Sequence, residues 1–86
     1  MFIYSIFDKK AVDFGPLFTS ENDETAKRLV LVNVCKDTML SSSPSDFSLY
    51  CLGEYNSHTG DVSGISPVKL VCEVLSLVKI EETESN

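Results

Sequence analysis

The sequence contains few residues that could carry out catalysis. Its single histidine, His58, lies in the polar stretch 56–61, whose residue types favour a turn. A Ser–His–Asp or Cys–His mechanism would need an activated nucleophile beside that histidine, and the sequence does not indicate one. The segment Gly60–Gly64 lacks the Lys-Ser/Thr pair that completes a P-loop. We therefore expect the protein not to be an enzyme.

The three cysteines do not form a metal-binding or disulfide pattern. Cys35, Cys51 and Cys72 are far apart in the chain, odd in number and each within an apolar stretch. A zinc site needs four ligands at suitable spacing, and only His58 could join them. We expect reduced thiols packed as small core residues, and neither a metal nor a cofactor.

Aromatic and basic residues are the stronger candidates for a binding role. Proteins hold single-stranded nucleic acid by stacking bases on aromatic rings with the help of a few cations. The candidate DNA-binding residues on this basis are Tyr4, Lys9, Lys10, Arg28 and Tyr50. Packing of the tyrosines in the core is the competing interpretation. A sheet face left uncovered would also be a surface for docking a protein.

The overall charge limits these functions. The 86 residues include 13 acidic and 7 basic side chains, which gives a net charge of −6. This surplus of acid argues against a general electrostatic grip on nucleic acid. No apolar run approaches the roughly 20 residues of a membrane span, and the N-terminus reaches Asp8 without the basic start of a secretory signal. We expect no membrane association.

The elements that must position these residues can be inferred from hydrophobic patterning. Residues 2–7 and 11–18 predict a β-hairpin whose second strand is bent by Gly15-Pro16. Apolar residues at three- and four-residue steps predict a helix over 25–36, and Ser and Pro residues predict a loop over 38–46.

The second half repeats this order. Residues 47–55 alternate clearly and predict a strand, followed by a turn over 56–61 and a short strand over 62–65. Ser66-Pro67 and the apolar spacing that follows predict a helix over 67–80. Alternation from Val68 to Val74 favours a strand as the rival interpretation. Residues 81–86 would form a frayed acidic tail.

A single sheet built from both halves of the chain could bury the apolar faces of both predicted helices, whereas neither half could do so alone. We therefore predict an α+β two-layer sandwich in one domain, residues 1–80. It would have a four-stranded antiparallel sheet and two helices on one face, in the order ββαββα.

Several segments resemble the small nonstructural protein of gokushovirus-type microviruses, which are tailless phages with circular single-stranded DNA genomes. The similar segments are Tyr4–Ala11, Phe14–Phe18, Ala26–Arg28 and Pro44–Asn56 followed by Thr59-Gly60. The resemblance spans about residues 2 to 70. The sequence departs from the usual pattern at Leu17, Leu29 and Val30, where aromatic residues are common.

The motif residues themselves are interpreted as determinants of the fold. They are Pro44, Asp46, Phe47, Gly53, Tyr55 and Gly60. Asp46 would cap the loop or accept a backbone N–H, and Gly53 would allow a bulge or the close approach of a neighbouring chain. Gly60 would close the second hairpin.

The resemblance implies a nonstructural product of early infection, acting in the host cytoplasm in single-stranded DNA synthesis or in the switch to packaging. We expect a non-enzymatic accessory factor that binds DNA weakly, a protein partner, or both. The expected partners are single-stranded DNA, a phage replication protein or host replication factor, and a second copy of the chain. The alternative is a protein-only inhibitor or modulator of a host factor.

Overall fold

The computed structural model describes residues 1–78. The acidic tail expected at 81–86, and the end of the helix expected over 67–80, lie outside these residues. The described elements, in chain order, are β1 (Phe2–Asp8), β2 (Asp13–Phe14), β3 (Phe18–Ser20), α1 (Asp23–Lys36), α2 (Thr38–Ser42), the 3₁₀ turn η1 (Pro44–Asp46), β4 (Phe47–Tyr55) and β5 (Val62–Glu73).

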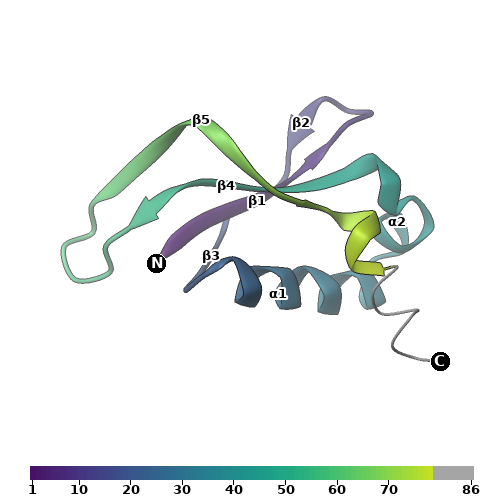
Figure 1. The fold of residues 1–86 in the computed structure, drawn as a ribbon, viewed down its shortest axis with the longest axis horizontal. Helices are drawn as coiled ribbons and strands as arrows, with labels where there is room; N and C mark the ends of the chain where they lie inside the picture. The colour runs from purple at the N-terminus through teal and green to yellow at the C-terminus, as the bar shows by residue number, and fades with distance from the viewer. Residues whose placement is uncertain (79–86) are drawn as a thin grey trace.

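The strands form one antiparallel sheet in the order β2-β1-β4-β5, with β3 also paired to β1. Helix α1 lies against one face of this sheet (Figure 1). Tyr4 and Leu49 of the two central strands are fully buried there, together with Ala26 and Val30 of the helix. The expected α+β architecture with an antiparallel sheet layered against helix is thus confirmed, with five strands in place of four.

Local signals explain where α1 begins and ends. The Asn22 side chain accepts a hydrogen bond from the Thr25 N–H, and Asp23 and Glu24 occupy the first turn, where negative charge is favoured. At the other end, Asp37 terminates α1, and its carboxylate accepts hydrogen bonds from the Met39 and Leu40 N–H groups of α2. Because Asn22 serves as the cap, the helix begins two residues before the predicted start.

The helix predicted over 67–80 is wrong for most of its length. Strand β5 continues to Glu73. Within the described part of the predicted helix, residues 67–78, only 74–78 are helical. Lys69 pairs with Cys51 and Glu73 pairs with Ser48, so β4 supplies the backbone partners that keep this segment extended. The local spacing of the apolar residues was compatible with both a helix and a strand, and the long-range pairing with β4 decided for the strand. The short helix still buries Val74.

Two further segments differ from the sequence-based expectation. The strand predicted over 11–18 is divided into β2 and β3 by Gly15-Pro16, because Pro16 has no N–H for the ladder while the Gly15 N–H donates to the Ile6 carbonyl. The loop predicted over 38–46 contains the short helices α2 and η1, and Leu40 of α2 is buried in the core.

Both motif glycines lie at positions where a side chain would be unfavourable. A side chain at Gly53 would collide with the backbone carbonyl of Ser63 in β5, so the two strands approach here only because Gly53 lacks a Cβ. The β4–β5 register also shifts between Cys51 and Gly53. Gly60 has φ +82° in the turn that closes the hairpin, a conformation that favours glycine.

The other motif residues also act in the fold. Pro44 opens η1, and Phe47 is 8% exposed in the core. The Asp46 carbonyl accepts from the Lys9 N–H at 2.9 Å, whereas its carboxylate pairs with Lys10. The Tyr55 N–H donates to the Met1 carbonyl at 2.7 Å, which fastens the N-terminus to the end of β4.

All three cysteines are free thiols, but they are not equally buried. Cys51 is buried and Cys72 is half-buried, whereas Cys35 is exposed on α1. The expectation that Cys35 packs in the core was therefore wrong, because α1 buries the side of the helix that carries Val30 and Val34. Among the described helices, none has the length and apolar character needed to span a membrane.

Candidate binding surface on the open face of the sheet

The face of the sheet opposite α1 carries no described helix (Figure 1). The strand register identifies the side chains on this face. Tyr4 pairs with Cys51 on the helix-covered side, so the next pair, Ser5 and Tyr50, points to the other side. By the same alternation Phe7 lies on the uncovered side, and its partner in β2 is Phe14. We call this uncovered side the open face.

Three aromatic rings meet on the open face. The ring centroids of Phe7 and Phe14 are 4.8 Å apart, and Tyr50 lies 5.6 Å from Phe14 and 6.1 Å from Phe7. Tyr50 meets both phenylalanines edge-on, with interplanar angles of 78° and 81°. These spacings and angles are typical of favourable aromatic pairs. Phe7, Phe14 and Tyr50 are hereafter the aromatic cluster.

The aromatic cluster continues into an exposed aliphatic strip on β5. Leu70 is the register partner of Tyr50 and is 50% exposed, and Val68 two residues earlier is 40% exposed. Phe14 is itself 39% exposed. The open face therefore presents both aromatic and aliphatic surface to solvent, which marks it as a candidate interaction surface.

The charges beside the aromatic cluster are largely balanced. Lys9 Nζ lies 2.8 Å from Glu73 Oε1, and the Ser48 hydroxyl also donates to the Glu73 carboxylate. These two donors hold the pKa of Glu73 below its usual value. Lys10, whose side chain is 80% exposed, lies 3.5 Å from the Asp46 carboxylate. Both lysines thus already have an acidic partner.

The structure brings together only part of the predicted DNA-binding set. Tyr50, Lys9 and Lys10 lie on or beside the open face, whereas Arg28 is exposed on α1, on the opposite side of the sheet. Tyr4 is fully buried beneath α1, so its ring has no surface on which a base could stack. Assignment of Tyr4 as a stacking residue is therefore corrected: it is a core residue.

Tyr4 instead anchors α1 to the sheet. Its hydroxyl donates to Asp23 Oδ1 at 2.8 Å, and Lys69 Nζ of β5 binds Asp23 Oδ2 at 2.9 Å. Burial and the adjacent carboxylate raise the pKa of Tyr4 far above its usual value. The hydrogen bonds from Lys69 and Tyr4 lower the pKa of Asp23 despite its partial burial.

Sequence reasoning missed Phe7 and Phe14. The alternation of β1 could have revealed Phe7, because it places Phe7 on the side away from Tyr4 and Ile6. Phe14 had no comparable signal, since β2 is only two residues long and its register depends on pairing with β1. Within residues 1–78, no group of three His, Cys, Asp or Glu side chains is arranged to hold a metal ion.

Comparison with known families identifies the chain. The model of the Phage ORF5 protein family matches residues 1–77, which include every described strand and the whole aromatic cluster. The chain belongs to the Phage ORF5 protein family. This membership confirms the phage origin implied by the sequence resemblance, and the chain is accordingly a phage accessory protein. The Phage ORF5 chain has no significant match among curated proteins or among solved structures.

Proposed function

We propose that this Phage ORF5 protein is a non-enzymatic factor that acts in the host cytoplasm during synthesis of viral single-stranded DNA or its switch to packaging. It would do so by holding a single strand weakly on the open face of its sheet. The observation that carries the proposal is the aromatic cluster, three rings gathered on a sheet face that no described helix covers.

The chemistry of this surface suits single-stranded DNA better than a duplex. Unpaired bases can stack on exposed rings, and each such contact is worth about 1–3 kcal/mol. Phe14 and Tyr50 are the members placed to receive a base, since Phe14 is partly exposed and Tyr50 adjoins the exposed Leu70. A duplex hides its base faces and would depend on phosphate contacts. The net charge of −6 disfavours that mode.

A labelled oligothymidylate of about 20 nucleotides tests the proposal by fluorescence anisotropy at low salt. The expected result is micromolar binding that Phe14→Ala combined with Tyr50→Ala weakens by roughly tenfold or more, as the loss of one to two stacked bases requires. Tyr55→Ala is the matched control, because it removes the same ring from the same strand at a position outside the aromatic cluster. Its affinity should change less than twofold.

The alternative function is modulation of a host or phage replication protein without DNA contact. Lys9 is paired with Glu73 and Lys10 with Asp46. These pairs favour the alternative, because each lysine would have to leave its acidic partner before it could contact a phosphate. Absence of oligonucleotide binding at low salt with micromolar protein would reject the DNA contact. Loss of phage DNA synthesis on substitution of the aromatic cluster would then support this alternative.

A further inference from the structure

A second candidate surface is a small pocket between the β1–β2 turn and α2, at the end of the sheet away from the β4–β5 turn (Figure 1). Its volume of about 330 Å³ falls within the size range of sites that accept a ligand or an anchoring side chain. Phe14, Met39 and Leu40 belong to its apolar lining. Phe14 is 39% exposed and Met39 is 63% exposed, so part of this apolar surface faces solvent. We call this site the end pocket.

Three aspartates also line the end pocket. Asp8 and Asp13 come from the β1–β2 hairpin, and Asp37 lies at the junction of α1 and α2. Because no lysine, arginine or histidine among residues 1–78 is part of the lining, the carboxylates give it a formal charge of −3. The pocket thus combines an apolar wall with uncompensated negative charge.

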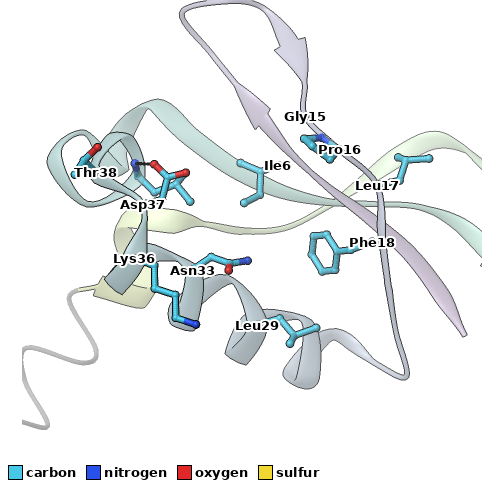
Figure 2. A pocket seen from close by; sticks show the side chains of 11 residues that line it. Ile6, Gly15, Pro16, Leu17, Phe18, Leu29, Asn33, Lys36, Asp37 and Thr38 are labelled. Atoms are coloured by element: carbon cyan, nitrogen blue, oxygen red, sulfur yellow. Dashed lines mark hydrogen bonds between the residues drawn. The ribbon is translucent and has the colours of Figure 1, made fainter.

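Neighbouring cations do not neutralise these carboxylates. None of the four ion pairs within residues 1–78 involves a pocket aspartate. Lys36, next to Asp37 in sequence, lines the neighbouring groove beside α1 and points away from the Asp37 carboxylate (Figure 2). The Asp8 and Asp37 carboxylates do accept backbone N–H groups, but these hydrogen bonds leave the negative charge in place.

The strand register places two of the aspartates directly opposite each other. Asp8 and Asp13 are register partners in the antiparallel pair of β1 and β2. Like charges in this position are destabilising. A positively charged occupant would relieve their repulsion, whereas a neutral one would not. The end pocket is therefore suited to a cation with an apolar part.

The chemistry of the lining narrows the choice of cation. Within residues 1–78, no group of three His, Cys, Asp or Glu side chains is arranged to hold a metal ion, so the pocket aspartates do not form a compact ion site. They would repel the phosphates of DNA. An arginine side chain suits the pocket, because its apolar stem can cover Met39 and its planar guanidinium can stack on Phe14 while it binds a carboxylate.

We propose that the end pocket docks a basic segment of a protein partner. The segment inserts an arginine side chain against Phe14 and Met39 and pairs its positive charges with the three pocket aspartates. The net charge of −6 on the whole chain steers such a partner toward the protein.

The probe is a fluorescein-labelled peptide of about ten residues, with arginine at every third position and glycine or serine elsewhere. The expected result at low salt is saturable binding with a dissociation constant of about 100 µM. Amide NMR shifts should be concentrated at Asp13, Asp37 and Met39. A peptide with lysine in place of arginine should bind about threefold more weakly, and one with the neutral isostere citrulline at least roughly tenfold more weakly.

Protein variants locate the contact. Asp8→Asn combined with Asp13→Asn should weaken peptide binding by roughly tenfold, and Met39→Ser by roughly threefold. Asparagine keeps a side-chain oxygen for the β1–β2 turn and Met39 is exposed, so the fold should be kept, which circular dichroism checks. Asp61→Asn is the matched control, because it removes the same charge from the exposed β4–β5 turn, and it should change affinity less than about twofold.

Several results would overturn the proposal. They are absence of binding at about 1 mM peptide, equal binding of the citrulline peptide, and an equal loss of affinity in Asp61→Asn. Displacement of the peptide by spermidine at the same concentration would also overturn it, because the pocket would then recognise charge and not a protein segment.

The test is separate from that of DNA binding on the open face. Tyr50 belongs to the aromatic cluster but does not line the end pocket. Tyr50→Ala should therefore weaken oligothymidylate binding and leave the affinity for the arginine peptide unchanged. A loss of peptide binding in this variant would place the peptide on the open face and reject the end pocket as its site.

Discussion

The hydroxyl of Tyr4 donates a 2.8 Å hydrogen bond to Asp23, which joins a central strand of the sheet to the first turn of α1. Lys69 of β5 completes the arrangement by binding the other oxygen of the same carboxylate at 2.9 Å. Three elements distant in sequence are thus fastened at one point. The ring that sequence reasoning assigned to DNA holds the two layers together.

Removal of this hydroxyl should destabilise the fold without affecting the open face. Tyr4 is fully buried, so Tyr4→Phe loses a hydrogen bond to a charged acceptor and should lower the free energy of unfolding by about 1–3 kcal/mol. Urea denaturation measures the change, and Tyr55→Phe, on a half-buried tyrosine, is the control. Unchanged oligothymidylate affinity is also expected, and a loss of that affinity in the folded variant would contradict the core assignment.

Acidification should weaken the fold through Asp23 and Glu73. Both carboxyl groups have a pKa lowered by their hydrogen-bond donors, so the unfolded state binds protons more readily than the folded state. Their contribution is present above the unfolded pKa of about 4 and is lost as pH falls through the lower folded pKa. Melting temperatures from pH 7 to pH 2 should therefore decline most steeply below about pH 4.

A matched substitution separates the contribution of Asp23 from general acid denaturation. Asp23→Asn should lower stability at pH 7 and flatten the decline on acidification, because this group can no longer take up a proton. Asp61→Asn, in the exposed β4–β5 turn, should leave the steepness of the curve unchanged. An equally steep curve for Asp23→Asn would show that Asp23 does not carry the effect.

Gly53 should be far less tolerant of a side chain than Gly64, its direct partner across the β4–β5 pair. A Cβ on Gly53 collides with the Ser63 carbonyl and also meets Gly64 Cα at 3.2 Å, whereas a Cβ on Gly64 meets nothing within 4 Å. Gly53→Ala should cost about 2–4 kcal/mol by forcing the strands apart, and Gly64→Ala less than about 1 kcal/mol. Chemical denaturation of the two variants provides the comparison, and equal losses would contradict the register.

Oligothymidylate binding on the open face should depend only weakly on salt. Lys9 and Lys10 are engaged by acids, so we expect one or two phosphate contacts and a slope of log K against log salt of about −1. Anisotropy titrations between about 20 and 200 mM salt measure the slope. A slope of about −4 or steeper would mean that cations, and not the aromatic cluster, hold the strand.

Glu73→Gln should strengthen that binding. The substitution removes the negative charge closest to Lys9 and frees the ammonium for phosphate, so affinity should rise about threefold and the salt slope should steepen. Glu24→Gln is the control, because it releases Lys27 on α1, on the covered side of the sheet. The same gain in both variants would indicate a general charge effect and not a contact at the open face.

Much of the fold follows from local patterns. The alternation of β4 predicts its bounds from Phe47 to Tyr55. The apolar spacing of α1 predicts the burial of Ala26, Val30 and Val34, although Leu29 in the same pattern is exposed. The turn at Gly60 also follows, because few other residues adopt its backbone conformation. In each of these segments the side-chain types and the final environment favour the same structure.

The candidate site could be predicted only in part. Tyr4 and Tyr50 are both tyrosines in strands, and their types do not reveal that one is buried beneath α1 while the other belongs to the aromatic cluster. Lys9 was recognised as a cation, but its partner Glu73 lies 64 positions later in the chain. Such pairings depend on strand order and register, which residue type alone does not fix.

The sequence by itself determined an acidic chain with an α+β fold, an alternating strand from Phe47 to Tyr55 and membership of a phage family. Tertiary structure decided that residues 67–73 form a strand, because hydrogen bonding to β4 outweighed a local apolar pattern from which a helix was predicted. It also decided which face of the sheet α1 covers. That choice buries Tyr4 and leaves Phe7, Phe14 and Tyr50 on the open side, because one helix can cover only one side of a single sheet.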